Sequence, residues 1–308
     1  GESQLSIVMS RFNEPSSLYK YFMKNSFIIL IFFNLIFSQE KKLLFIGIDG
    51  CRSDALKIAN TPNINRLIDT GLLIENSFCS VNEQPTVSGP GWSTMLTGVW
   101  YDKHGVSDNS FSESNLDEYL PFNFLMKRGN EQYHMASFIM WKPINEHIFK
   151  NSMDYNKLLP KFDDAIAKEA SKYIKKPELD VLFLNFDHVD HAGHWYGFNP
   201  KKKRYIKAIE KVDGYIGKIV DSMRTRSSFE NEDWLIIITS DHGGKKRSHG
   251  GQSIEEIQIP IILSSSSPRI ENLIRQTYLT DIVPTILHHF DIEIDPVWQL
   301  DGSTLIDS

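Results

Sequence analysis

The stretch KLLFIGIDG, residues 42–50, is a nearly unbroken apolar run that ends in an aspartate, and two other stretches share this pattern. They are DVLFLNFDHVD at 180–190 and WLIIITSDHGG at 234–244. Apolar runs of this length are typical of strands that are buried on both faces, as in a parallel sheet covered by helices. Because ligands of such sheets bind beyond the carboxyl ends of the strands, we expect Asp49, Asp187 or Asp190, and Asp241 to meet at one edge of the sheet.

Segments typical of strands and of helices alternate along the rest of the chain. Further strands are expected at 72–81, 135–140 and 257–263, and helices at 54–69, 115–129, 162–175, 202–224 and 279–290. This alternation predicts an α/β fold, in the form of a three-layer sandwich whose mostly parallel central sheet is flanked by helices. Nothing marks a second domain, so we expect a single domain over residues 39–308.

The N-terminal residues have the composition of a targeting segment. From Met23 the chain reads MKNSFIILIFFNLIFSQE, in which a lysine precedes a short apolar core at 27–37 and a polar stretch. This pattern is typical of a signal peptide and is short for a membrane span. We therefore expect residues 1–38 to be an N-terminal extension and signal peptide, the protein to be periplasmic or secreted, and no stable membrane span to remain after cleavage. An uncleaved anchor is the alternative.

The overall charge limits the kinds of partner. The chain has 308 residues and a net charge of −6, which argues against nucleic acid as a partner. The basic runs KKKR at 201–204 and KKR at 245–247 are interpreted as solvated loops, although the second could attract an anionic substrate. Cys51 and Cys79 could pair in an exported protein, and the sequence leaves this open, as it does the oligomeric state.

The stretch QPTVSGPGWSTMLTGVWYDKHGVSDN, residues 84–109, places Ser88 at the start of an expected helix. A helix N-terminus offers free N–H groups and the positive end of the helix dipole, which suit a phosphate or sulfate. A serine at this point can attack such a group. The alternative is that Ser88 only caps the helix.

Four histidines stand close to the strand-end aspartates in the sequence, namely His191, His194, His242 and His249. Clustered carboxylates repel one another, so their ionised forms are costly to bring together without a cation. Aspartate and histidine together suit zinc or a similar divalent ion. These residues therefore predict a metal site at the edge of the sheet.

Six motifs occur in one order along the chain: IGIDGCRSDAL, TPNINRL, SGPGWSTMLTGVWYDKHGVSDN, DHAGHWYG, TSDHGG and SHGG. With this set, the chain resembles the alkaline phosphatase superfamily and, within it, the type I phosphodiesterase/nucleotide pyrophosphatase family. The resemblance extends over about residues 43–302. It implies an alkaline phosphatase-like catalytic domain that hydrolyses small phosphate esters, with phosphodiesters and nucleotide pyrophosphates as the first expectation.

The same resemblance implies two divalent metal ions, zinc in the first place, and a covalent phospho-serine. Carried over residue by residue, it assigns one ion to Asp49, Ser88, Asp241 and His242, and the other to Asp190, His194 and His249. Ser88 matches the nucleophile, at a position where the family often has threonine. Asn109 matches an asparagine that donates a hydrogen bond to a non-bridging phosphate oxygen.

In DHVDHAGH, two Asp/His pairs have the same spacing, Asp187 with His191 and Asp190 with His194. The position directly after the strand favours Asp187. Gly193, which would allow close backbone approach, and the D-x-x-G-H pattern of the family favour the second pair. We predict that Asp190 and His194 bind the metal, and that His191 supports the ligands or faces the substrate.

Several relatives of the same superfamily are alternatives. A sulfatase is disfavoured because Trp92 stands where the C/S-x-P-x-R signature of sulfatases has arginine. A phosphomonoesterase or a phosphonate hydrolase would share the metal ligands, and a monoesterase would favour extra cationic contacts, for which Arg52 and Lys142 are candidates. An inactive binding relative is the remote alternative, since each position of the metal set is filled.

Overall fold

Strands dominate the centre of the fold. In the computed structural model, which describes residues 39–160, 162–265 and 275–306, one sheet has the strand order β4-β3-β5-β1-β6-β7-β2-β8. The strands are β1 (Glu40–Ile48), β2 (Gly71–Phe78), β3 (Met135–Ile139), β4 (Tyr155–Leu158), β5 (Val181–Phe186), β6 (Glu232–Thr239), β7 (Gln258–Ser265) and β8 (Thr277–Tyr278). β7 runs antiparallel to both β6 and β2, whereas β1, β3, β4 and β5 pair in parallel. The predicted signal peptide lies outside the described residues.

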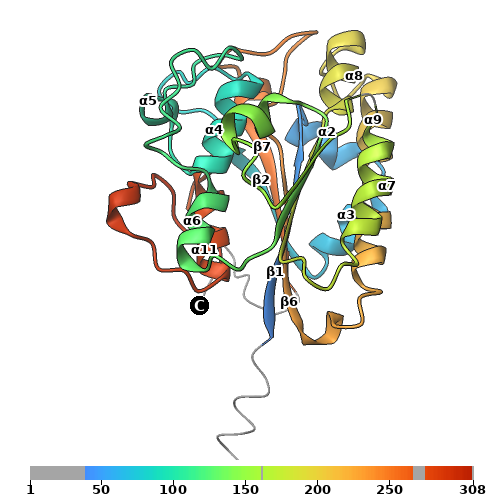
Figure 1. Cartoon of the computed structure of the whole chain (residues 1–308). Helices are drawn as coiled ribbons and strands as arrows, with labels where there is room; N and C mark the ends of the chain where they lie inside the picture. Colours follow the sequence, from blue (N-terminus) through green and yellow to red (C-terminus); the bar gives the residue numbers. More distant parts are fainter. Residues whose placement is uncertain (1–38, 161, 266–274, 307–308) are drawn as a thin grey trace, which may run out of the picture. The chain divides into compact units, whose positions relative to one another are not determined.

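Helices cover both faces of this sheet (Figure 1). One face carries α2 (Ser53–Ile58), α3 (Pro62–Ile68), α7 (Asp163–Tyr173) and α9 (Lys203–Met223), and the other carries α4 (Ser88–Thr97), α6 (Phe122–Gly129) and α11 (Ile282–His289). Shorter helices are α5 (Tyr101–His104), α8 (His188–Tyr196) and α10 (Ile254–Ile257). The predicted three-layer α/β sandwich is confirmed.

The alternation of side chains along β1 shows why both layers are needed. Leu44, Ile46 and Ile48 pack against one layer of helices, while Leu43 and Phe45 pack against the other. All five side chains are buried. Burial on both faces explains why the strand is a continuous apolar run in the sequence.

Two expectations about local structure were wrong. The helix expected at 115–129 begins only at Phe122, because the residue before a proline disfavours helical backbone and Pro121 therefore marks the helix start. Residues 188–196, for which no helix was expected, form α8.

The structure also answers the question about the cysteines. Cys51 and Cys79 are both buried free thiols. Cys51 belongs to the apolar cluster on one face of the sheet and Cys79 to the cluster on the other. The sheet therefore separates the two thiols.

Candidate active site

The carboxyl ends of three adjacent central strands, β5, β1 and β6, form the floor of the site. Asp49 directly follows β1, and its N–H donates to Phe186 O at the end of β5 (2.8 Å). Asp241 follows β6 by two residues, and its Oδ1 accepts the Gly50 N–H (3.1 Å). The parallel arrangement of β1 and β5 and the position of β6 thus bring carboxylates from distant parts of the sequence together.

Ser88 is the first residue of α4 and lies above this edge. Its Oγ is 3.4 Å from His242 Nε2, and only 7% of the residue is exposed. The cap residue of the helix is Val87, so the capping role considered for Ser88 is wrong. A Cβ at Gly91 would lie 2.6 Å from Asp241 O, so this glycine lets the first turn of α4 pack directly on the aspartate.

The backbone N–H groups at the start of α4 are largely occupied, contrary to expectation. Gly91 N–H donates to Val87 O (3.0 Å), Pro90 has no N–H, and Gly89 N–H donates to Asn109 Oδ1 (2.6 Å). This last bond orients the Asn109 amide so that its NH₂ group points away from Gly89. The start of α4 therefore offers an anion fewer free N–H donors than expected.

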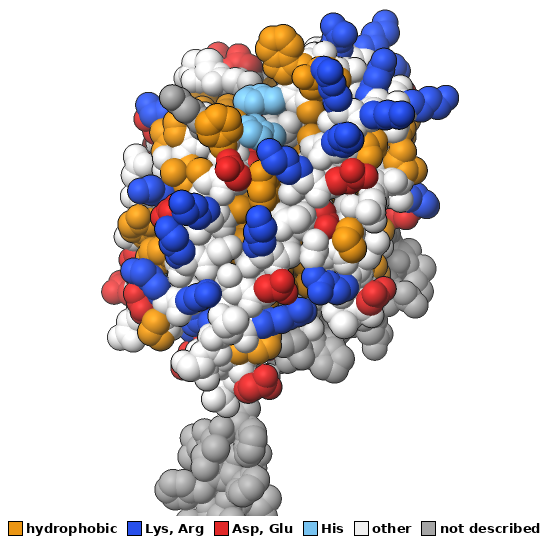
Figure 2. All heavy atoms as spheres, turned by 90° about the vertical axis from the view of Figure 1, so that its right-hand side faces the viewer, with side chains coloured by type: hydrophobic (Ala, Val, Ile, Leu, Met, Phe, Trp, Pro, Cys, Tyr) orange, Lys and Arg blue, Asp and Glu red, His pale blue; other side chains and the backbone are white. Residues whose placement is uncertain are grey.

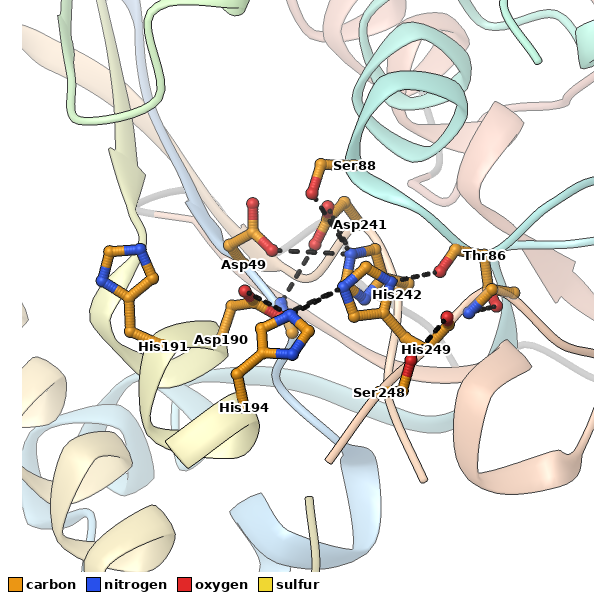
Figure 3. Close-up of polar contacts among 12 residues, drawn as sticks. Asp49, Thr86, Ser88, Asp190, His191, His194, Asp241, His242, Ser248 and His249 are labelled. Carbon is orange, nitrogen blue, oxygen red and sulfur yellow. Dashed lines mark hydrogen bonds and ion pairs between the residues drawn. The ribbon is translucent and has the colours of Figure 1, made fainter. Parts of the chain in front are cut away.

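The predicted ligands form two groups that touch (Figure 3). We call Asp49, Ser88, Asp241 and His242 the inner group, and Asp190, His194 and His249 the outer group. In the inner group, His242 Nε2 lies 3.5 Å from Asp49 Oδ1 and 3.3 Å from Asp241 Oδ2. In the outer group, Asp190 Oδ2 lies 3.3 Å from His194 Nε2, and Asp190 Oδ1 lies 3.6 Å from His249 Nε2.

Two contacts connect the groups. The rings of His242 and His249 stack with centroids 3.9 Å apart. Asp190 belongs to both sets of donors whose atoms lie within 4.8 Å of one another, Asp190 with His194 and His249, and Asp49 with Asp190 and His242. Gly50 makes this possible, because a Cβ there would lie 2.8 Å from Asp190 Oδ1.

Three buried carboxylate oxygens fit a bound cation. Among the described residues, Asp49 Oδ1, Asp190 Oδ1 and Asp241 Oδ2 have no hydrogen-bond partner although they are buried. Oxygens of this kind are costly to bury unless a positive charge compensates them. The donor set of carboxylates and imidazoles suits a divalent ion such as zinc.

The imidazoles are held in the tautomer that a metal ligand needs. Nδ1 of His242, His249 and His194 lies 2.8–2.9 Å from the backbone oxygens of Gly243, Thr86 and Arg247, respectively. A carbonyl oxygen can only accept, so each Nδ1 carries the proton and each Nε2 presents its lone pair to the site. His194 Nε2 and His249 Nε2 are 3.1 Å apart, a contact that requires a cation or a proton between them.

The pKa values of the carboxyl groups reflect the same crowding. Burial, followed by the charges of Asp241 and Asp190, raises the pKa of Asp49 well above its usual value. Burial also raises the pKa of Asp241 and lowers that of His249 to about 4. Burial acts to raise the pKa of Asp190 as well, but the hydrogen bond with His194 and the nearby imidazoles outweigh it and the pKa is lowered.

The competing pair lies beside the site and not within it. His191 Nε2 is 3.4 Å from Asp187 Oδ2, and neither residue belongs to the two donor sets. In Figure 3, His191 stands apart from the other labelled imidazoles. Gly193 is needed for packing, because a Cβ there would collide with the Phe198 ring. The glycine therefore does not support the choice of His194 over His191 as a ligand.

Sequence reasoning missed the residues that hold the ligands in place. Trp92 lies in the core, and from this fully buried position its Nε1–H donates to Asp49 Oδ2 (3.0 Å). Arg52 is not available for a substrate, since it donates to Phe198 O (2.8 Å) and Gly244 O (3.1 Å) and pairs with Asp54. The signal in the sequence was the position of Trp92 and Arg52 inside motifs that also contain predicted metal ligands.

The predicted site residues lie within a stretch that matches a known protein family. The model of the type I phosphodiesterase/nucleotide pyrophosphatase family matches residues 43–257, which include the whole predicted metal set. The chain belongs to this family. The expected resemblance is thereby confirmed, and the chain is a member of a family of hydrolases.

Individual members of the type I phosphodiesterase family are distant in sequence. Human bis(5'-adenosyl)-triphosphatase ENPP4 is 27% identical over 225 residues, which cover 67% of this chain and 48% of that protein. The chain thus spans about half the length of the curated relatives it matches.

Solved structures show that the fold is shared. Murine ectonucleotide pyrophosphatase/phosphodiesterase 5, an inactive variant in complex with AMP, has a TM-score of 0.62 and 15% identity, with 87% of this chain and 100% of that chain covered. Ps i-CgsB in complex with k-i-k-neocarrahexaose has a TM-score of 0.66 and 18% identity, with 86% and 75% covered. The predicted alkaline phosphatase-like fold is confirmed.

Proposed function

We propose that this protein is a metal-dependent hydrolase of small phosphodiesters or nucleotide pyrophosphates, and that Ser88 is its nucleophile. The observation that carries the proposal is the convergence of Ser88 Oγ with six Asp and His side chains, three of whose buried oxygens have no partner among the described residues. Membership of the phosphodiesterase family supports the same reaction class.

Two divalent ions, zinc in the first place, would be held by the inner and the outer group. When bound, they would supply positive charge that neutralises the phosphate and favours the ionised form of the Ser88 hydroxyl. Asp190 lies within reach of both donor sets, so loss of either ion would leave its carboxylate less well compensated.

The residues of the chain account for the rest of the reaction. Ser88 Oγ loses its proton to solvent and forms a bond to phosphorus while the bond to the leaving oxygen breaks, and the leaving group takes a proton from solvent. Water then attacks the phosphorus, the bond to Ser88 Oγ breaks, and Oγ regains a proton as the water loses one. Asn109, whose Oδ1 is held by Gly89 N–H (2.6 Å), donates its NH₂ group to a non-bridging oxygen.

A diester is favoured over a monoester because the two candidate cationic contacts are engaged elsewhere. Arg52 is committed to backbone oxygens and Asp54, and Lys142 pairs with Glu146 at 2.6 Å. A monoester carries more negative charge, and the buried Arg52 does not offer it a partner. Assays with the corresponding substrates separate the phosphomonoesterase, phosphonate hydrolase and sulfatase alternatives.

Export of the protein is also part of the proposal. It is supported by the apolar stretch at 27–37 and by relatives named ectonucleotide enzymes.

We expect kcat/KM for a bis-aryl phosphodiester to exceed that for the aryl phosphate monoester by at least roughly tenfold, about 1.4 kcal/mol of transition-state stabilisation. A steady-state comparison that includes the aryl sulfate and an aryl phosphonate checks this. The chelated protein serves as control and should be inactive. A higher kcat/KM for the monoester would change the assignment to a phosphatase.

Removal of the hydrogen bond from Trp92 to Asp49 should weaken metal binding. Trp92→Phe is expected to lower metal affinity by roughly 10–100-fold, as is typical for partners of ligands, and to reduce the free energy of unfolding by about 1.5–3 kcal/mol. Trp234→Phe is the matched control, since Trp234 Nε1–H donates to the buried Glu232 (2.8 Å) in β6, away from the site. Metal titration should separate the variants, and equal metal affinities would contradict the role of Trp92.

A further inference from the structure

Two basic runs that are far apart in the sequence lie side by side in the structure. The Phe198 N–H donates to Lys246 O (2.7 Å), which joins the segment before α9 to the loop after β6. At Gly197 the two runs nearly touch, since a Cβ there would lie 3.2 Å from Lys246 O and 3.5 Å from Lys202 Cε. We call the seven cations of these runs the basic rim: Lys201, Lys202, Lys203, Arg204, Lys245, Lys246 and Arg247.

The basic rim concentrates charge on a protein that is acidic as a whole. All seven residues are exposed, and within the described part of the chain only Lys245 has an ion-pair partner, Glu255 at 3.5 Å. The net charge of the chain is −6. Lysine and arginine side chains gather at the upper end of the face shown in Figure 2, where they spread over the outside of the molecule.

An exposed tryptophan adjoins these cations. Trp195 is 73% exposed at the end of α8, two residues before the Gly197 at which the runs meet. The neighbouring Tyr196 contacts Arg204, whose guanidinium lies 4.6 Å from the ring centroid. Tryptophan is amphipathic and is enriched where a membrane meets water.

We propose that the basic rim and Trp195 form a docking surface for an anionic phospholipid membrane. Clustered lysines and arginines next to an exposed aromatic side chain match the charge and the apolar boundary of such a surface. Single-stranded nucleic acid would need a series of bases stacked on aromatic side chains, whereas beside the rim Trp195 is 73% exposed and the next aromatic ring, Tyr196, is 39% exposed and already in contact with Arg204. The cations also lie on the outside of the molecule, as a broad planar partner requires.

Docking in this way would set the candidate active site beside the lipid headgroups. Trp195 directly follows His194, and His194 Nδ1 donates to the backbone oxygen of Arg247 in the rim (2.9 Å). The proposal does not rest on the proposed function, because binding is measured without turnover.

The test is co-sedimentation of the full chain with phosphatidylcholine vesicles that either contain or lack phosphatidylserine, at low and at physiological ionic strength. The protein is expected to bind the anionic vesicles and to stay in solution with the neutral ones. Combined Lys201→Glu, Lys202→Glu and Lys203→Glu should lower the partition coefficient about 100-fold, since each lysine near the surface contributes about fivefold. Trp195→Ala should lower it roughly tenfold, because an apolar contact is lost.

The matched control reverses the same number of charges elsewhere. Combined Lys168→Glu, Lys172→Glu and Lys175→Glu changes exposed lysines on and after α7 and should leave vesicle binding within about twofold, because charges remote from the bilayer are screened. Equal losses in the two triple variants would overturn the proposal, since net charge alone would then explain binding. The proposal would also fail if Trp195→Ala left vesicle binding unchanged while an oligothymidylate bound the rim as tightly as the vesicles.

Discussion

Ser88→Ala is expected to lower kcat for a phosphodiester by roughly 10⁴-fold or more, because removal of a nucleophile leaves only the catalysis that binding and electrostatics provide. The Ser88 hydroxyl is the one alcohol among the proposed inner ligands, and an ionised alcohol can form a bond to phosphorus and release it again. The fold should remain intact, since Ser88 is not the cap of α4.

Ser93→Ala is the matched control for this variant. Ser93 lies in the same helix, is fully buried, and its Oγ has no hydrogen-bond partner among the described residues. Removal of an unsatisfied hydroxyl should leave both kcat and the free energy of unfolding about unchanged, or raise the latter slightly. If Ser88→Ala kept a tenth or more of the wild-type kcat, Ser88 would not be the nucleophile.

Asp190→Asn and His194→Ala are each expected to lose one of two metal equivalents and to lower activity by more than roughly 100-fold, beyond the range typical of residues that only support ligands. The reason is geometric. Asp190 lies within reach of both donor sets, and His194 Nε2 faces His249 Nε2 at 3.1 Å.

The matched controls have the same residue types at the same spacing. Asp187→Asn and His191→Ala should keep both metal equivalents, with activity reduced by at most roughly 100-fold. Burial, followed by the charge of Asp190, raises the pKa of Asp187, and asparagine keeps the size and shape of this side chain. Elemental analysis of the four purified variants decides between the pairs, and loss of metal from the Asp187 and His191 variants alone would reverse the assignment.

The sheet edge could be predicted because buried parallel strands leave a direct signal. The apolar runs before Asp49, Asp187 and Asp241 correspond to β1, β5 and β6, which are neighbours in the sheet. Continuous apolar residues identify such strands without any knowledge of the partner strand. The convergence of the aspartates then follows from the parallel direction of the chain.

Elements without an apolar signature could not be predicted in this way. α8 reads HVDHAGHWY, in which polar ligands and a glycine interrupt any helical period, and β4 is a partly exposed edge strand next to β3. In both cases tertiary contacts outweigh local propensity.

Contacts between distant segments were equally hidden from the sequence. The bond from Trp92 to Asp49, the burial of Arg52 and the meeting of the two basic runs at Gly197 each join residues that are more than 40 positions apart or lie on different elements. The separation of Cys51 and Cys79 by the sheet belongs to the same class. Spacing alone contains no information about such pairs.

The proposed mechanism requires a covalent intermediate at Ser88. The metal-loaded protein should be mixed with a bis-aryl phosphodiester, quenched in acid during turnover, digested and analysed by mass spectrometry. We expect the substrate phosphorus, still carrying its second aryl group, on the peptide that contains Ser88, and no adduct in Ser88→Ala. An adduct on any other residue, or turnover with no adduct at any quench time, would show that Ser88 is not the nucleophile.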